Sequence, residues 1–525
     1  MQITIEPVLW LVEVVVVCLS VKANFFMLFR GDWLDMRNAT IINILFVALL
    51  ASASVLTTIE AAAAQKDTLL DRSERAVDWV AQQAVTYEDG MIAFADETDT
   101  FGGRVYTEAN ARVAWMFQNH YQHLTSRKYE QQFQSAVNFV LTGQAATGDF
   151  NEYFDIAQRS WSNSGKLHYW NAFVSAMLSL TAINMRRLPE LGIKHEYWTR
   201  VISRVETFVE RWSDSGLQRD GSWVFTYNDG VRPGIAENGM MLATLSCLSA
   251  YEFRWGDRVK GTGYSTIAKK TASWLLDMQE MDQSKWSWGG FYEDRTRTMQ
   301  ISLPNARAMH GILVYWEFIS VSVESDPSLY DMLRERLVAW AEGFFGKMRD
   351  DFGGPYVQRD ANGASKYPKR TLEAAEFIRD IGIIWVDHGE PKYWSWTELT
   401  CQWLLGNNEA RTDLQQAKNL KGQTGGFYVG IQQNASVDQR STTLAVSICA
   451  EAMLYALYID VPEFHRSGLV AAILIIGTLI LTRRRRVARN QYHRISERLV
   501  QKTHATRRDE RLPKISLLSS KRAHR

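Results

Sequence analysis

The stretch Gly425-Gly426-Phe427-Tyr428 decides the fold, because a glycine followed within four residues by an aromatic residue recurs at five earlier places in the chain. The earlier copies begin at Gly90, Gly148, Gly221, Gly289 and Gly353. Successive copies lie 58 to 73 residues apart. A period of this length is typical of stacked supersecondary units and not of one irregular core.

Each glycine–aromatic turn lies between two helix-like runs. The run before a turn has a one-sided apolar pattern, as in Val201, Val205, Phe208 and Val209. The run after a turn is apolar all round, as from Met240 to Leu248, which is typical of a buried helix. We therefore expect an all-α domain, an (α/α)6 toroid of six helical hairpins, with the second helix of each hairpin in the inner ring.

Apolar segments flank this domain on both sides. The run from Ile41 to Ala64 follows Arg37 and ends in four alanines, which indicates a signal peptide or membrane anchor. Near the other end, Gly468 to Thr482 is followed at once by four arginines, typical of a transmembrane helix with a cytoplasmic stop signal. The start codon stays open between Met1 and Met36.

These segments predict four parts of the chain: a signal or anchor (1–65), an extracytoplasmic toroid (66–460), a transmembrane helix with its arginine stop (461–486) and a basic cytoplasmic tail (487–525). From Arg483 onward the chain carries 15 Lys and Arg against 3 Asp and Glu, so the preceding part is net acidic. An acidic body argues against nucleic acid as a partner and leaves the membrane and an extracellular ligand.

The C-terminal segment also resembles a known sorting signal. Val461-Pro462-Glu463-Phe464, a short apolar run and an arginine cluster are similar to the archaeal PEF-type C-terminal signal. That resemblance implies a membrane-bound processing enzyme as a partner. This chain continues for 39 residues beyond the arginines, so retention as a simple single-span anchor is the alternative.

Several classes of site have no motif in the sequence. A P-loop, a Rossmann GxGxxG, an HExxH and a Ser–His–Asp nucleophile elbow are all missing, and we expect neither a cofactor nor a metal. Three of the four cysteines, Cys247, Cys401 and Cys449, fall in helix-like runs, which favours buried free thiols. A Cys401–Cys449 bridge stays open.

The turns of such a toroid gather at the N-terminal ends of the inner helices, where acidic residues are frequent. Glycoside cleavage needs two carboxyl groups facing each other across a cavity, one of them a proton donor. Acids beside aromatic clusters in these loops are the candidates for this pair. The predicted catalytic residues are Glu237, Glu293, Asp294 and Asp155.

Aromatic residues near the same turns are candidates for binding sugar rings by stacking. The predicted substrate-binding residues are His168, Trp170, Trp223, Tyr227, Trp288, Tyr292, Tyr356 and Tyr428. Four arginines of these loops, at positions 104, 159, 232 and 295, fit either an acidic sugar or ion pairs with the loop acids.

The sixth repeat resembles the six-hairpin glycosidase-like toroids. The matching segments are WLLGNN at 403–408, TGGFYVG at 424–430 and QRSTTLA at 439–445. The resemblance implies a glycan-active protein, such as a hydrolase, lyase or epimerase. Arg440 stands where that pattern often has a glutamate, so a non-catalytic glycan-binding or structural envelope protein is the alternative.

Prenyltransferase and terpene-cyclase toroids share the Gly-Gly-Phe repeat and give a second alternative. Those enzymes require clustered aspartates, and this chain has neither DDxxD nor DxDD. The terpenoid alternative therefore lacks its characteristic residues.

Overall fold

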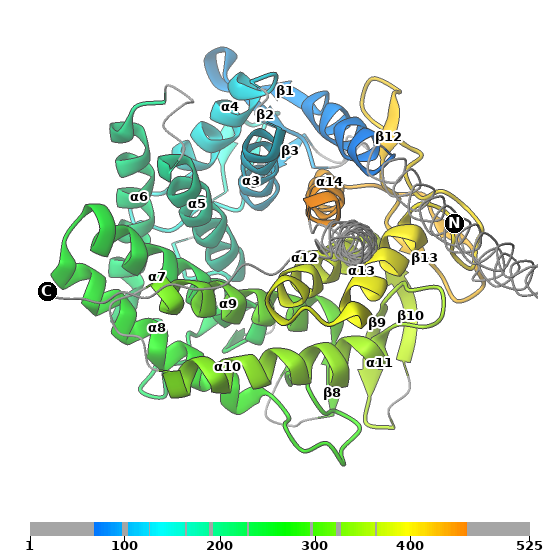
Figure 1. Ribbon diagram of the computed structural model, residues 1–525. Helices are drawn as coiled ribbons and strands as arrows, with labels where there is room; N and C mark the ends of the chain where they lie inside the picture. The colour runs from blue at the N-terminus through cyan, green and yellow to red at the C-terminus, as the bar shows by residue number, and fades with distance from the viewer. Residues whose placement is uncertain are drawn as a thin grey trace, which may run out of the picture. The chain divides into compact units, whose positions relative to one another are not determined.

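The computed structural model describes residues 68–96, 103–124, 127–162, 165–187, 193–227, 230–293, 298–321, 327–362 and 365–458. Six helices in this part of the chain form a closed inner ring, in which each contacts the next and the last contacts the first (Figure 1). They are α3 (Thr107–Leu124), α5 (Tyr169–Arg187), α7 (Ile235–Trp255), α9 (Ser302–Val321), α12 (Thr371–His388) and α14 (Thr443–Tyr458). The predicted inner ring of second helices is confirmed.

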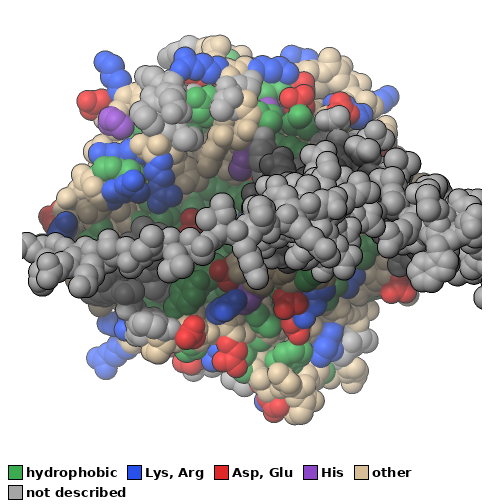
Figure 2. Space-filling model, in the orientation of Figure 1, with side chains coloured by type: hydrophobic (Ala, Val, Ile, Leu, Met, Phe, Trp, Pro, Cys, Tyr) green, Lys and Arg blue, Asp and Glu red, His purple; other side chains and the backbone are tan. Residues whose placement is uncertain are grey.

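The first helix of each hairpin packs outside this ring. The outer set consists of a helix over 68–81, α4 (Glu130–Thr142), α6 (His195–Ser213), α8 (Arg258–Met278), α10 (Pro327–Ala339) and α13 (Pro391–Leu404). In α6, the predicted apolar stripe is buried, with Val201, Val205 and Phe208 at 0% exposure. Figure 2 shows charged side chains around the edge of this face and also near its middle, with hydrophobic side chains between them.

The fifth outer helix is irregular. After α10 the chain passes through a π-helical segment, Trp340–Phe345, and ends in α11 (Gly346–Met348). This π-helical segment, whose turn is wider than that of an α-helix, contains Gly343, which packs directly against Trp288 of the preceding repeat. A single π-helical turn of this kind accommodates a close approach without ending the helix.

Short antiparallel strands, which the all-α expectation did not include, join the paired helices. The largest sheet has the order β14-β13-β10-β9-β8 and collects strands from the fourth, fifth and sixth repeats. Its strands are β8 (Met299–Ile301), β9 (Tyr356–Asp360), β10 (Ser365–Arg370), β13 (Gly430–Ile431) and β14 (Val437–Asp438). Its backbone pairing ties three neighbouring loops together.

Smaller sheets occupy the other loops. They are β1 (Ala84–Thr86) with β2 (Ile92–Phe94), β3 (Arg104–Tyr106) with β4 (Tyr153–Asp155) and β5 (Ser160–Trp161), β6 (Phe225–Tyr227) with β7 (Gly230–Arg232), and β11 (Ala417–Lys418) with β12 (Thr424–Gly426). The strands are too short for the sequence pattern to mark, because two or three residues give no alternation to detect.

The repeated turn has a physical basis in two contacts. Gly221 has φ +90°, and a Cβ there would lie 2.5 Å from the carbonyl oxygen of Lys270 on the next outer helix, so only glycine fits. Two residues on, the N–H of Trp223 donates to Oδ1 of Asn238 (2.7 Å), and Nδ2 of Asn238 donates back to the Trp223 carbonyl (3.0 Å). The turn is thereby fixed to the first turn of the inner helix.

The same pair of hydrogen bonds between an asparagine side chain and the backbone of the turn, which we call the asparagine clamp, occurs in three more repeats. Its other pairs are Asn110 with Phe94, Asn171 with Phe150 and Asn305 with Phe291. In the sixth repeat, Ser441 Oγ donates to the Phe427 carbonyl in place of an amide. The side chains of Phe94, Phe150, Phe291 and Phe427 are fully buried. The repeated aromatic residue therefore holds the turn against the core.

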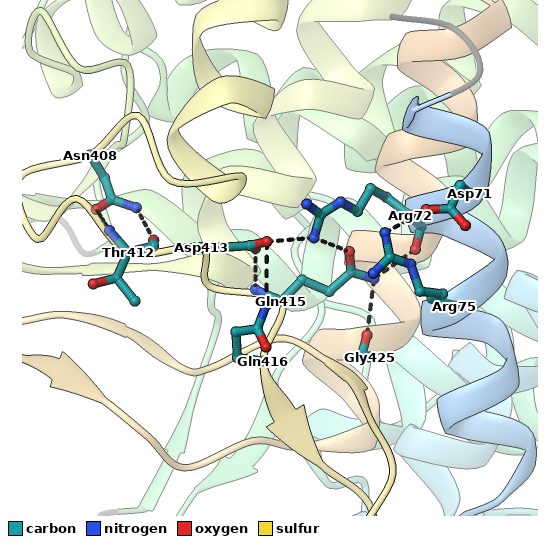
Figure 3. Close-up of polar contacts among 9 residues, drawn as sticks. All are labelled: Asp71, Arg72, Arg75, Asn408, Thr412, Asp413, Gln415, Gln416 and Gly425. Atoms are coloured by element: carbon teal, nitrogen blue, oxygen red, sulfur yellow. Dashed lines mark hydrogen bonds and ion pairs between the residues drawn. The ribbon is translucent and has the colours of Figure 1, made fainter. Parts of the chain in front are cut away.

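The ring closes between the sixth repeat and the first helix (Figure 3). Arg72 on the helix over 68–81 forms an ion pair with Asp413. Gln415 donates from Nε2 to the backbone carbonyls of Arg72 (2.6 Å) and Gly425 (3.0 Å). The sixth turn thus packs on the first outer helix as each earlier turn packs on the next.

The predicted signal or anchor segment, the transmembrane helix and the basic tail lie outside the described residues. Within the described part, none of the helices combines the length and the apolar character needed to cross a bilayer. Cys247, Cys401 and Cys449 are buried free thiols, as expected, so the alternative Cys401–Cys449 bridge is not formed.

Candidate active site

One end of the ring is defined by the strands. Strands β3, β8 and β10 each run directly into the first residue of an inner helix, at Thr107, Ser302 and Thr371. The N-terminal ends of the inner helices and the turn loops therefore meet at the same end, which we call the ring mouth. Helix N-termini carry partial positive charge and unpaired N–H groups, so this end is the natural place for a polar ligand.

An ion pair crosses the ring just inside the mouth. Glu108 is the second residue of α3, and Arg307 lies on α9, which is three places further round the ring of six. Arg307 Nη2 lies 3.0 Å from Glu108 Oε1, and the two side chains are 13% and 20% exposed. The guanidinium also lies over the ring of Phe173 on α5, at 4.4 Å. These contacts place Arg307 on the axis of the ring.

A second carboxyl group, Glu373, lies in the first turn of α12 and is 1% exposed. Burial raises the pKa of Glu373, and the nearby charge of Glu376 adds to this effect. Arg370 and Arg307 oppose it, and Arg370 Nη1 lies 3.7 Å from Glu373 Oε1. A protonated carboxylic acid is thus favoured here relative to an exposed glutamate.

Tyr169 is the exposed aromatic residue of this neighbourhood, at 38% exposure. Burial of its hydroxyl and the negative charges of Glu108, Glu152 and Glu237 raise the pKa of Tyr169 to about 12, while Arg307 opposes this. Three carboxylates and one arginine therefore surround a phenol ring at the mouth. The ring offers a flat surface against which a sugar can stack.

Beneath these groups lies a second layer of buried charge, which we call the axial layer: Arg112, His310, Glu376, Arg379, Asp380 and Glu451. Arg112 on α3 pairs with Glu451 on α14 at 2.7 Å, and both side chains are 1% exposed. On α12, Arg379 pairs with Glu376 (2.5 Å) and Asp380 (2.9 Å). Residues of four inner helices thus meet in the interior.

The charged groups of the axial layer shift one another's pKa values. Burial raises the pKa of Asp380 to about 7 in spite of Arg379 beside it. Glu376 has its pKa lowered to about 2, because Arg379 and Arg112 outweigh the effect of burial. His310 Nδ1 lies 3.3 Å from Asp380 Oδ1, and burial lowers the pKa of His310 well below its ordinary value. A neutral histidine therefore faces an acid that titrates near neutrality.

A cavity of about 1030 Å³ opens beside the N-terminal ends of α12 and α14. It is lined by Asp96 from the first repeat and by loops of the fifth and sixth repeats. Arg370 belongs both to this lining and to the surroundings of Glu373. The cavity and the buried acid therefore share one side chain.

The predicted catalytic residues are dispersed around the mouth. Glu237 lies in the first turn of α7 and is one of the carboxylates near Tyr169. Asp155 ends β4, where its Oδ1 accepts a hydrogen bond from the Gln158 N–H at 2.9 Å, a turn contact. Glu293 is half-buried in the loop after the fourth turn. Asp294 lies outside the described residues.

Two of the predicted sugar-binding residues occupy buried positions. Trp223 is fully buried and donates to Thr271 Oγ1 at 3.3 Å, so it packs against α8 and has no face for a ligand. Tyr292 is 3% exposed, and its hydroxyl bonds to Ser287 and Glu280 within its own loop. For Trp223 the physical reason is the pair of hydrogen bonds with Asn238, which turns this side chain toward the core, whereas Tyr292 is held by the bonds of its hydroxyl group.

Trp170 is also buried, at 8% exposure, and it stacks on His168 at 4.3 Å. The remaining predicted binding residues lie nearer the surface. Tyr356 packs over the buried Lys369, at 4.5 Å from Nζ to the ring centroid. Trp288, Tyr356 and Tyr428 are half-buried in the fourth, fifth and sixth loops, and Tyr227 ends β6.

Sequence reasoning counted Glu108 and Glu373 among the acids of the mouth, although not among the predicted catalytic residues, and passed over the charged residues deeper in the apolar inner helices. Glu373, Glu376 and Asp380 follow one another at spacings of three and four residues, which puts them on one face of α12. Glu108 and Arg112 have the same spacing on α3. A charged stripe on a helix that is otherwise apolar was the available signal.

Among the described residues, no group of three or more potential ligands is placed to hold a metal ion.

Comparison with known proteins bears on the fold. No family model matches the sequence, and a search of curated proteins finds no match. Among solved structures, cellobiose 2-epimerase from Bacillus thermoamylovorans B4167 is similar with a TM-score of 0.53 and 11% identity, over 74% of this chain and 99% of that chain.

Two further structures show the same likeness. A D-mannose isomerase has a TM-score of 0.53 and 12% identity, over 74% of this chain and 97% of that chain. A cellulase of C. cellulolyticium in complex with cellobiose has a TM-score of 0.51 and 9% identity, over 74% of this chain and 98% of that chain. Identities this low show the fold alone, and the fold they show is the helical toroid predicted from the repeat.

Proposed function

We propose that this protein is a carbohydrate-active enzyme that carries out acid–base chemistry on a glycan at the ring mouth. The observation that carries the proposal is the set Glu108, Arg307 and Glu373, in which Arg307 pairs with Glu108 and also acts electrostatically on Glu373, a carboxyl group of another inner helix. Glycoside cleavage and sugar epimerisation both require a proton donor and a proton acceptor on either side of the reacting atoms.

The two carboxyl groups have different surroundings, which gives them different roles. Glu373 is buried and favours the protonated form, so it acts as the proton donor. Glu108 is paired with Arg307 and partly exposed, so it takes the role of the base or nucleophile. Arg307 stabilises negative charge that develops between them, since its guanidinium is fixed on the axis.

Carbohydrate is the substrate class that this mouth fits. Tyr169 supplies an exposed ring beside the carboxylates, and the adjoining cavity is wide enough for a sugar unit. The solved structures that share the fold are described as an epimerase, an isomerase and a cellulase, and this supports the same class here.

Other predictions from the sequence are retained within this proposal. Glu237 is a third carboxylate at the mouth, and Glu293, Asp294 and Asp155 stay predicted participants from the loops. The ring is proposed to lie outside the cell on a membrane anchor, with a glycan as its ligand and a processing enzyme acting on the C-terminal segment. Hydrolysis is the first expectation and epimerisation or elimination the alternatives.

One experiment distinguishes these reactions. The full chain is incubated in D2O with a panel of oligosaccharides, and the products are followed by proton NMR and by assay of reducing ends. New reducing ends without deuterium on carbon and without a vinyl proton indicate hydrolysis, whereas new reducing ends together with a vinyl proton indicate elimination. Deuterium at a ring carbon without chain cleavage indicates epimerisation. Binding without any product, at all substrates tested, would leave a glycan-binding protein and overturn the enzyme proposal.

Substitution of the two carboxyl groups tests their roles. We expect Glu373→Gln and Glu108→Gln each to lower kcat by about 100-fold or more, which is the usual contribution of a positioned acid or base. The matched control is Glu335→Gln, an exposed residue on outer helix α10, which should leave kcat unchanged. Full activity in a folded Glu373→Gln variant would remove Glu373 from the mechanism.

A further inference from the structure

The cavity beside the mouth has a lining unlike that of a neutral sugar site. It contains no aromatic side chain, and its apolar members are small or aliphatic. Its polar side chains are Asp96, Arg370, Thr371, Gln432, Asp438, Gln439, Arg440, Ser441 and Thr442. Binding in such a cavity depends on charge and hydrogen bonds, because no flat ring is available for stacking.

The two acids of the lining are already engaged. Asp438 accepts hydrogen bonds from Arg440, at 3.0 Å from Nε and 2.7 Å from Nη2. Asp96 Oδ1 accepts the N–H of Leu444 at 3.0 Å, and so caps the first turn of α14. The negative charges of the lining therefore serve an ion pair and a helix cap.

Arg370 differs from these groups. Its side chain is 46% exposed, and its ion pair with Glu373 is long, at 3.7 Å. It is also the N-cap residue of α12, which places it at the N-terminal end of that helix. The positive ends of α12 and α14 add to its charge at the same wall, since both helices begin at the lining.

We propose that this cavity binds an anionic sugar unit, and that Arg370 holds the carboxylate of a uronate there. The proposal rests on the proposed function, since it names the substrate class of the same site. A planar guanidinium binds a carboxylate through two parallel hydrogen bonds, which is stronger and more directional than its present long contact. The bound carboxylate then competes with Glu373 for Arg370.

This competition has a chemical consequence for the proton donor. Arg370 is the largest of the influences that favour ionisation of Glu373. When a uronate carboxylate draws the guanidinium toward the cavity, that influence weakens and Glu373 keeps its proton to higher pH. An acidic glycan thereby supports the protonated state of the group that acts on it, and a neutral glycan does not.

The test compares acids with their uncharged esters. Trisaccharides of glucuronate, galacturonate and mannuronate, each with its methyl ester, are titrated into the full chain by calorimetry. At least one acid should bind about tenfold or more tightly than its own ester, as expected for a hydrogen bond to a charged group. Arg370→Gln should remove this preference, and Arg370→Lys should restore part of it.

The matched control is Arg258→Gln, an exposed arginine on outer helix α8, which should keep the preference. If no acid binds better than its ester, or if folded Arg370→Gln keeps the preference, the anionic subsite is overturned. Neutral oligosaccharides separate this outcome from failure of the proposed function, because they would still be bound or turned over. Where turnover is measurable, the alkaline limb of kcat should lie at higher pH for the acid than for its ester.

Discussion

Asp380 shows how a single buried residue couples the interior of the ring to pH. Its carboxyl group is completely buried among Arg379 and Glu376 of its own helix, Arg112 of α3 and His310 of α9. Burial raises its pKa from 3.8 to about 7, so the folded protein keeps a proton that the unfolded chain has released. The contribution of this carboxyl group to stability therefore falls as pH rises from about 4 to about 7.

Asp380→Asn should flatten this dependence, because an amide does not titrate. We expect the free energy of unfolding of the wild type relative to that of the variant, both measured by chemical denaturation, to fall between pH 4.5 and pH 7. Glu376 titrates near pH 2 and stays ionised throughout this window. Curves that run parallel for the two proteins would show that Asp380 is ionised in the folded state across the whole range.

The same residues explain what the sequence could and could not predict about the site. Acids near the mouth were expected, and Glu237 does lie beside Tyr169. The axial layer was missed because a buried Arg379 on an apolar helix looks unfavourable in isolation. Its charge is balanced by Glu376 and Asp380 on its own helix and by Glu451 from α14, and the last of these needs the tertiary structure.

At the scale of the element, the turn glycines decide how closely successive hairpins approach. Gly221 has positive φ and lies against the backbone of α8, and Gly353 is placed in the same way against Leu399 of α13. A side chain at either position meets both backbone strain and a carbonyl group that cannot move without its helix.

Gly221→Ala should therefore lower the free energy of unfolding by about 1 to 3 kcal/mol. Gly263, within α8, is the matched control, since a Cβ there meets nothing within 4 Å. Gly263→Ala should be neutral or should stabilise the protein by about 0.5 to 1 kcal/mol, because alanine is the better helix former. Thermal or chemical denaturation of both variants checks the pair, and equal effects would contradict this account of the turn.

At the scale of the whole molecule, closure of the ring depends on the seam between residues 408–425 and the helix over 68–81. Asp413→Asn should weaken the pair with Arg72 and loosen this seam by about 1 kcal/mol, a modest value because both side chains are partly exposed. Hydrogen exchange of the helix over 68–81 should become faster. Asp71→Asn, which breaks only an exposed pair with Arg75, is the control and should change little.

The architecture was predictable from sequence to a large extent, since a period of 58 to 73 residues with paired helices leaves few alternatives to a ring. Helix order and the inner and outer positions followed from the apolar pattern, as in α6 and α7. The five-stranded sheet did not follow, because β8, β9 and β13 come from three separate loops and pair only once the ring brings them together.

Because the seam closes the ring, the ring could begin at another of its helices. The helix over 68–81 lies beside α14, with Ser73 Oγ donating to the Ala450 carbonyl, as other outer helices lie beside inner ones. The step from residue 458 to residue 68 is equivalent to the loop of five residues that joins α3 to α4. A circularly permuted chain, joined there and opened between Leu124 and Glu130, would keep the same order of helices around the ring, so the ring does not require its present first helix to come first in the chain.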